Sequence, residues 1–121
     1  MQLIKDRIKE SIEVKSKILE DRELLGLIEN AANEVIKCIS SGGKVCLCGN
    51  GGSASDAMHI AGELVGRFQE ERKSLPAIAL NGDVTSMTSV ANDYGYERVF
   101  ERFVEDICQV FRHEYHTYQI I

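Results

Sequence analysis

A short apolar run that is followed at once by a glycine-rich bend constrains the fold of this 121-residue chain most strongly. Residues 44–48 have the length and the flanking turn residues of a strand that is buried on both faces, as in a parallel sheet. Three glycines in residues 49–53 then break the chain sharply, and apolar residues recur at helical spacing over residues 53–67. A buried strand, a tight turn and a helix in this order predict an α/β fold.

Helical and apolar patterns organise the rest of the chain. Helical periodicity extends over residues 4–19 and again over residues 22–40, where Gly42 and Gly43 end the second helix. The later elements are a buried strand at residues 76–80, a helix at 84–91, a loop at 92–95 and a last helix from Glu97. The expected domains are an N-terminal helical hairpin (1–41), a partial parallel-sheet domain (42–107) and a divergent tail (108–121).

Two strands are too few for a stable parallel sheet, because each strand needs neighbours and covered faces. The chain therefore either donates strands to an oligomer or forms the N-terminal part of a longer α/β domain. We favour the second interpretation, in which the chain is truncated relative to a complete domain.

Composition disfavours several classes of function. Apolar residues make up 44% of the chain, enough for a core, and the formal net charge of −5 disfavours a broad nucleic-acid surface. No apolar run approaches the length of about 18 residues that spans a bilayer, and the N-terminus lacks the layout of a signal peptide. We expect no nucleic-acid partner, no membrane partner, a cytoplasmic location and reduced cysteines. Cys46 and Cys48 lack the second pair that a zinc site needs.

The bend after the first strand has the features of an anion site. Glycine lets the backbone turn tightly and approach a ligand, and the N–H groups and dipole at a helix start attract a phosphate. Asn50 and Ser53 add polar side chains to this bend. The candidate ligands of a phosphate or phosphosugar are Asn50, Gly51, Gly52 and Ser53. The alternative is a plain strand-to-helix connection in which Ser53 caps the helix.

Three ionisable residues, Asp56, His59 and Glu63, recur along the predicted helix. At about 100° per residue they lie within roughly one helix face, and a rise of ~1.5 Å per residue places Glu63 about 10–15 Å from the bend. His59 and Glu63 are four residues apart and suit a shared divalent metal, although two ligands alone do not hold a catalytic zinc. The alternative is a solvated acidic face with a hydrogen-bonded histidine.

Asn92 and Asp93 form a second polar candidate, in the loop expected before Gly95. Their side chains offer the hydrogen-bond donors and acceptors that suit sugar hydroxyls. A plain turn explains the same residues equally well, because Asn, Asp and Gly all favour turns.

Several short motifs occur in order and at consistent spacing along this sequence. They are residues 42–45, 48–53, 56–59, 63–64, 66–67, 76–79 and 91–95. Together they resemble the phosphoheptose isomerases of the sugar-isomerase (SIS) superfamily, over about residues 1–107. The resemblance implies a Rossmann-like SIS domain in a cytoplasmic homotetramer. It also implies isomerisation of D-sedoheptulose 7-phosphate to D-glycero-D-manno-heptose 7-phosphate, an early step towards lipopolysaccharide and related glycans.

The same resemblance implies roles for individual residues. Glu63 matches the catalytic base, which moves a proton between adjacent carbons through an enediol, and His59 and Glu63 match zinc ligands. The residues that match substrate-binding positions are Asn50, Gly51, Gly52, Ser53, Glu63, Asn92 and Asp93. Proton abstraction next to a carbonyl requires a positioned base together with a metal or dipole that stabilises the oxyanion, in agreement with these roles.

The resemblance ends at residue 107. The family continues with a third strand, a phosphate loop rich in serine and threonine, and later a Gln and a His, whereas residues 108–121 match none of these. We therefore expect the chain not to be fully competent alone. The alternative function is a non-catalytic SIS protein that binds a phosphosugar or a partner protein such as a replication initiator. Glu63 and the Gly-Gly-Ser bend favour the enzyme.

Overall fold

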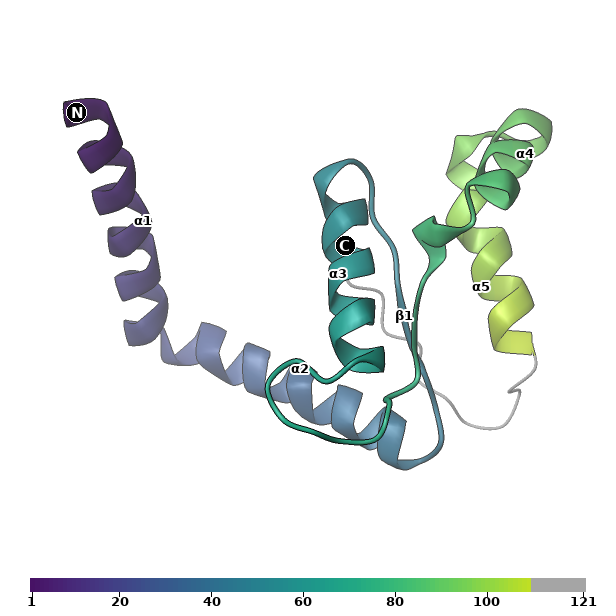
Figure 1. The fold of residues 1–121 in the computed structure, drawn as a ribbon, viewed down its shortest axis with the longest axis horizontal. Coiled ribbons are helices and arrows are strands. Elements are labelled where there is room, and N and C mark those ends of the chain that lie inside the picture. Colours follow the sequence, from purple (N-terminus) through teal and green to yellow (C-terminus); the bar gives the residue numbers. More distant parts are fainter. Residues whose placement is uncertain (110–121) are drawn as a thin grey trace. The chain divides into compact units, whose positions relative to one another are not determined.

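The structure is a computed structural model, and it describes residues 1–109 of the chain (Figure 1). It contains two compact units, Met1–Ile36 and a second unit that begins at Lys37. The elements are α1 (Gln2–Glu20), α2 (Arg22–Ser40), β1 (Val45–Leu47), α3 (Gly52–Val65), β2 (Ala77–Ala79), the 3-10 helix η1 (Leu80–Gly82), α4 (Val84–Tyr94), the 3-10 helix η2 (Tyr96–Arg98) and α5 (Val99–Gln109). The predicted α/β order of helices and strands is confirmed, and the predicted tail falls mostly outside the described residues.

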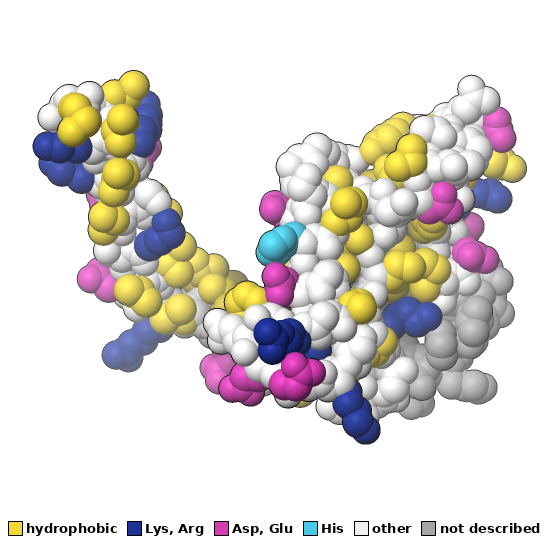
Figure 2. Space-filling model, viewed as in Figure 1, with side chains coloured by type: hydrophobic (Ala, Val, Ile, Leu, Met, Phe, Trp, Pro, Cys, Tyr) yellow, Lys and Arg dark blue, Asp and Glu magenta, His cyan; other side chains and the backbone are white. Residues whose placement is uncertain are grey.

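The first unit consists of α1 and most of α2. Asp21 separates the two helices, because its backbone is extended and its carboxylate accepts a 2.9 Å hydrogen bond from the N–H of Leu24 at the start of α2. Neither helix buries a residue in the described chain, and Figure 2 shows hydrophobic side chains along α1. The two helices are confirmed, whereas their pairing as a hairpin stays a prediction.

β1 and β2 form a parallel two-stranded sheet, and α3 connects them. The paired residues are Val45 with Ala77, Cys46 with Ile78 and Leu47 with Ala79. Successive strand residues point to opposite faces, so Cys46 and Ile78 face away from the side that buries Leu47. Ile78 is 43% exposed, so the prediction that residues 76–80 form a buried strand is wrong. Within the second unit, the described elements leave the Ile78 face of this sheet partly uncovered.

The core lies where α3 packs on the two strands. Ala57 and Ala61 are buried one helical turn apart, and their small side chains let α3 approach the sheet closely. The other buried apolar residues are Val45, Leu47, Leu80 and Val99. This packing sets the start of α3 beside the carboxyl end of β1, where the glycine bend lies.

After β2, the elements α4, η2 and α5 pack on one another. Asp83 caps α4, since its carboxylate accepts hydrogen bonds from the Ser86 hydroxyl at 2.5 Å and the Ser86 N–H at 3.0 Å. These two bonds hold the pKa of Asp83 below its usual value. Among residues 1–109, no helix is both long and apolar enough to cross a membrane.

α4 is longer than the sequence predicts. It continues to Tyr94 and ends at Gly95, whose φ is +94°. The prediction of a loop is therefore wrong for Asn92 and Asp93, which lie in the last turn of α4. Gly95 ends the helix because glycine adopts positive φ without strain, and the Asn-Asp pair before it does not interrupt the helical hydrogen bonds.

Candidate functional site

The bend between β1 and α3 requires glycine at two positions. Gly51 has a φ of +55°, in the left-handed region that residues with a Cβ rarely adopt. A Cβ on Gly49 would lie 2.6 Å from the Cβ of Ser53 and 2.7 Å from its carbonyl carbon, so a larger residue does not fit. The predicted glycine bend is confirmed, and it brings the end of β1 against the first turn of α3.

Ser53 does not cap α3. The N-cap residue is Gly51, and Ser53 is the second residue of the helix. The N–H groups of Ser53 and Ala54 bond to the carbonyls of Asn50 and Gly51, at 3.0 and 3.2 Å. The alternative in which Ser53 serves as the cap is therefore wrong, and the Ser53 side chain instead lines a pocket.

Asn81, in η1 directly after the neighbouring strand β2, holds this bend. It is buried, with 8% of its surface exposed. Its Oδ1 accepts a 3.1 Å hydrogen bond from the N–H of Gly49, and its Nδ2 donates a 2.6 Å bond to the Gly49 carbonyl. Gly49 lies beyond the last paired residues of the two strands, and Asn81 provides the hydrogen-bond partners of both its backbone N–H and its C=O. This role is not apparent from the sequence alone. The signal that could have indicated it is a polar residue soon after β2, at the same sheet edge as Gly49.

Tyr96 orients the Asn50 side chain. Its hydroxyl donates a hydrogen bond to Asn50 Oδ1, and its ring packs edge-on against Phe100 with 6.5 Å between the ring centroids. A carboxamide whose oxygen accepts such a bond presents its NH₂ group as a donor, which suits the oxygens of a phosphate or a sugar. This contact is not visible in the sequence, because the two residues are 46 positions apart.

His59 and Glu63 face each other on α3. His59 Nε2 lies 3.4 Å from Glu63 Oε1, as the spacing of four residues allows. The His59 side chain is 76% exposed and the Glu63 side chain 38% exposed. The prediction that both residues share one helix face is confirmed, and the Glu63 carboxylate is partly covered while still open to a ligand.

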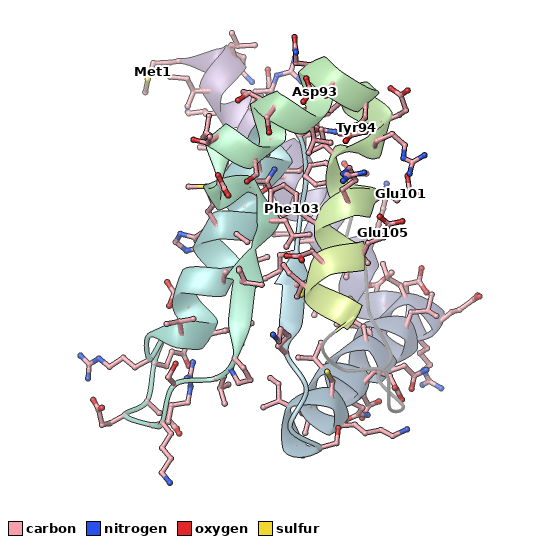
Figure 3. All side chains as sticks on the ribbon, turned by 90° about the vertical axis from the view of Figure 1, so that its right-hand side faces the viewer. Met1, Asp93, Tyr94, Glu101, Phe103 and Glu105 are labelled. Atoms are coloured by element: carbon pink, nitrogen blue, oxygen red, sulfur yellow. The ribbon has the colours of Figure 1, made fainter. Side chains whose placement is uncertain are left out.

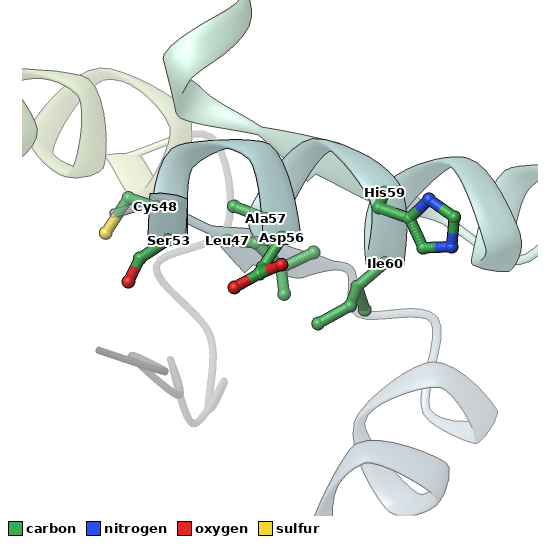
Figure 4. Close-up of a pocket in the computed structure, with 7 residues that line it drawn as sticks. All are labelled: Leu47, Cys48, Ser53, Asp56, Ala57, His59 and Ile60. Carbon is green, nitrogen blue, oxygen red and sulfur yellow. The ribbon is translucent and has the colours of Figure 1, made fainter. Parts of the chain in front are cut away.

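A pocket of about 330 Å³ lies beside the first turns of α3 (Figure 4). Its lining residues are Leu47, Cys48, Ser53, Asp56, Ala57, His59 and Ile60. Three of these, Ser53, Asp56 and His59, supply polar side chains from α3 (Figure 4). Burial raises the pKa of the Cys48 thiol, so this wall of the pocket is uncharged at neutral pH. The pocket thus runs from the glycine bend to His59, and Glu63 follows one helical turn later.

The predicted metal ligands fit zinc in type and separation but supply only part of a site. Imidazole nitrogen and carboxylate oxygen both bind zinc, and two tetrahedral ligands about 2.0–2.1 Å from an ion are roughly 3.3 Å apart. The separation of 3.4 Å between His59 and Glu63 agrees with this value. Among residues 1–109, no group of three or more His, Cys, Asp and Glu side chains is arranged to hold a metal ion.

Asn92 and Asp93 do not line the pocket formed by the described residues. Both are exposed in the last turn of α4, where Figure 3 labels Asp93. Asn92 Nδ2 donates a 2.9 Å hydrogen bond to Asp93 Oδ1. Beside them, the Arg102 guanidinium stacks on the Tyr94 ring, 4.2 Å from its centroid. A role of Asn92 and Asp93 in substrate binding stays a prediction.

The fold and the bend together define a class of protein. A glycine bend at the carboxyl end of a parallel strand, leading into a helix, is typical of α/β proteins that bind a phosphorylated small molecule. Within that class, residues 8–107 match the model of the SIS domain family. The chain therefore belongs to the SIS domain family, as its motifs predict.

Similar curated proteins carry the name phosphoheptose isomerase. The chain is 52% identical over 99 residues to the phosphoheptose isomerase of Aneurinibacillus thermoaerophilus, an alignment that covers 82% of this chain and 50% of the relative. It is 51% identical over 102 residues to phosphoheptose isomerase 2 of Campylobacter jejuni, with 84% and 51% covered. The chain spans about half the length of the curated relatives it matches.

Solved structures give the same result. Phosphoheptose isomerase GmhA from Neisseria gonorrhoeae superposes with a TM-score of 0.77 at 34% identity, covering 88% of this chain and 53% of that one. A phosphoheptose isomerase from Francisella tularensis superposes with a TM-score of 0.72 at 38% identity, covering 86% and 55%. These likenesses confirm the predicted fold class, a partial SIS domain with a parallel sheet.

Proposed function

We propose that the chain supplies the glycine bend and the catalytic base of a phosphoheptose isomerase. The observation that carries the proposal is the arrangement of α3, with a glycine bend at its start and the His59–Glu63 pair further along. A rise of ~1.5 Å per residue separates Gly52 from Glu63 by about 16 Å along the axis. An extended seven-carbon phosphosugar with its phosphate at the bend would bring its carbonyl end towards Glu63. The names of the similar proteins support this substrate class.

The proposed reaction converts D-sedoheptulose 7-phosphate into D-glycero-D-manno-heptose 7-phosphate. Glu63 acts as a general base that takes a proton from C1, and the C2 carbonyl oxygen gains a proton to give an enediol. Glu63 then returns a proton to C2 while the C1 hydroxyl loses its own, which leaves an aldehyde at C1. The substrate and the product are isomers, so the reaction involves no net oxidation or reduction. The Asn50 NH₂ group, oriented by Tyr96, donates to a substrate oxygen near the bend.

We also propose zinc as the cofactor, with His59 and Glu63 as two of its ligands. Zinc bound there would polarise the substrate's oxygens as a Lewis acid. The donor types and their separation of 3.4 Å support this assignment. Glu63 has two carboxylate oxygens, of which Oε1 faces His59, so the second oxygen is available for the proton transfer.

The proposed setting is a cytoplasmic homotetramer that supplies heptose for lipopolysaccharide or related glycans. The first unit supports the association of several chains, because an apolar stripe of α1 is exposed to solvent in the single chain. The stripe consists of Leu3, Ile4, Ile8 and Ile12, which are all more than half exposed. An apolar face of this kind is expected to be covered by another subunit.

The proposal is tested by deuterium exchange in D₂O. Wild-type chain is incubated with sedoheptulose 7-phosphate and zinc, and NMR follows deuterium at C1 of the ketose and C2 of the aldose. Although full turnover is not expected from this chain alone, slow exchange is expected with the wild type and about 10³-fold less with Glu63→Gln, because the amide cannot act as a base. Glu70→Gln, which removes an exposed acid between α3 and β2, is the matched control and is expected to leave exchange unchanged. Equal exchange by wild type and Glu63→Gln contradicts the proposal.

The alternative, a non-catalytic SIS protein that binds a partner protein, predicts a different pattern. It expects no exchange from any variant and expects Glu63→Gln to leave partner binding unchanged. The glycine bend and the Glu63–His59 pair, which such a protein does not need, favour the enzyme.

A further inference from the structure

The C-terminal end of α3 is held by one side chain, that of Arg72. The last carbonyls of a helix have no partner within the helix. Arg72 Nη2 lies 2.7 Å from the carbonyl of Glu63, and Nη1 lies 2.8 Å from the carbonyl of Leu64 and 3.1 Å from that of Gly66. The guanidinium therefore donates hydrogen bonds to three backbone carbonyls where α3 ends, those of residues 63, 64 and 66.

The connection between α3 and β2 is shaped around this contact. Phe68, near the start of the connection, has a φ of +43°, although it is not a glycine. Backbone of this kind persists only where surrounding contacts hold it. Further along the connection, the N–H of Leu75 donates a 3.0 Å bond to the Leu64 carbonyl, and Arg72 donates a 3.0 Å bond to the Lys73 carbonyl. The connection thus folds back to bring Arg72 to the end of α3.

Charge and shape both suit arginine at this position. The C-terminal end of a helix carries a partial negative charge, which a cation stabilises. A guanidinium is planar and offers five N–H donors in a fixed fork, so it can bond several carbonyls at once. The ammonium of a lysine keeps the charge but is a compact donor on a flexible stem, so it cannot reproduce this set of bonds.

One of the carbonyls that Arg72 binds belongs to Glu63 itself. Glu63 is the third residue from the end of α3, in the turn that frays first when a helix end loses its partners. Its carboxylate lies opposite His59 only while this turn stays helical, because the 3.4 Å contact depends on the spacing of four residues. The glycine bend lies at the other end of this 14-residue helix, which is about 20 Å long at ~1.5 Å per residue.

We propose that Arg72 is a positioning residue for Glu63, which holds the last turn of α3 so that the carboxylate stays opposite His59. The proposal rests on the proposed function for its catalytic consequence. It predicts that loss of Arg72 disturbs Glu63 and the chemical step, and leaves the binding of the phosphate at the glycine bend unchanged.

The first test needs no catalysis. NMR three-bond couplings report whether the Glu63 χ1 angle occupies one rotamer, and amide hydrogen exchange reports the bonds at Gly66 and Leu75. In Arg72→Met the couplings are expected to average and both amides to exchange about tenfold faster. Lys73→Met, which removes a neighbouring cation, is the matched control and is expected to change neither. Arg72→Lys is expected to be intermediate, and it decides the question if Arg72→Met does not fold.

The second test separates chemistry from binding. In Arg72→Met the kcat for deuterium exchange into the heptose phosphate is expected to fall at least about tenfold, with KM within about twofold of the wild type. Millimolar guanidinium is expected to restore part of the lost kcat. A raised KM with unchanged kcat overturns the proposal, as do unchanged Glu63 couplings in Arg72→Met and Arg72→Lys. A wild-type chain with ordered Glu63 but no deuterium exchange contradicts the proposed function, and the couplings still decide the role of Arg72.

Discussion

The two ends of α3 are built by opposite means. At the N-terminal end the backbone forms the site, since Gly49 and Gly51 have no Cβ and Asn81 holds the Gly49 peptide from η1. At the C-terminal end a long charged side chain, Arg72, satisfies the helix carbonyls beside Glu63. The bend at the first end therefore requires residues without a side chain, and the second end requires a long one.

This difference separates two functions along one helix. Changes at the glycine bend are expected to weaken the binding of a phosphosugar, whereas changes at the Arg72 end are expected to slow proton transfer. The predictions for Asn81, Gly51 and Tyr96 below alter the first end or the residues that support it, and the last prediction alters the start of α4.

The largest effect is expected from Asn81→Leu, which leaves the N–H and C=O of Gly49 buried without partners. Each unsatisfied group costs about 1–3 kcal/mol, so the free energy of unfolding should fall by about 2–6 kcal/mol. Urea unfolding measures this, with Asn30→Leu on the exposed surface of α2 as the control. A loss below about 0.5 kcal/mol would show that Asn81 does not hold the bend.

Gly51→Val is expected to have the next largest effect. A Cβ at a φ of +55° costs about 1–2 kcal/mol, and the branched side chain obstructs the approach of a phosphate. Phosphosugar affinity, measured by calorimetry, should fall at least about tenfold. Gly62→Ala in the same helix is the opposite case, because its Cβ meets no atom within 4 Å and alanine should stabilise α3 by about 0.5–1 kcal/mol. Unchanged phosphosugar affinity in Gly51→Val would favour a plain strand-to-helix connection.

Tyr96→Phe is expected to give a smaller effect, confined to ligand binding. It removes only the hydroxyl that orients Asn50, a contribution of about 1 kcal/mol, or about fivefold in affinity. Stability should change little because this contact is exposed. Tyr94→Phe is the matched control, since Tyr94 contacts Arg102 through its ring face and the ring remains. Equal phosphosugar affinities for the two variants would contradict the role of Tyr96.

The smallest effect is expected from Asp83→Asn, at the start of α4. Hydrogen bonds from Ser86 lower the folded-state pKa of Asp83 below its unfolded-state value. The ionised carboxylate therefore adds stability above the unfolded-state pKa, and this contribution is lost as the pH falls through the folded-state pKa. The wild type should be more stable than Asp83→Asn at neutral pH, and thermal unfolding should show the difference shrinking in acid. A difference that does not depend on pH would contradict this account.

Local features of the fold and site could be predicted from the sequence, because they depend on neighbouring residues. The glycine bend follows from the lack of Cβ atoms, and the His59–Glu63 pair follows from helical spacing. The end of α4 was harder to predict, because Asn92 and Asp93 favour turns but are also tolerated in a last helical turn before Gly95.

The supports of the site could not be predicted, because they join distant parts of the chain. Asn81 and Gly49 are 32 positions apart, and Tyr96 and Asn50 are 46 positions apart. Nothing in the local pattern around Arg72 distinguishes it from a solvated arginine in a charged connection. Its role depends on how the connection after α3 folds back, which is a tertiary property.

A crystal structure of the chain with sedoheptulose 7-phosphate tests most directly whether one helix serves the two halves of the substrate. The account predicts the phosphate within hydrogen-bond distance of the backbone N–H groups near Gly51, and the Glu63 carboxylate about 3–3.5 Å from C1 or C2. A phosphate bound elsewhere, with the carboxylate of Glu63 turned away from the sugar, would contradict it.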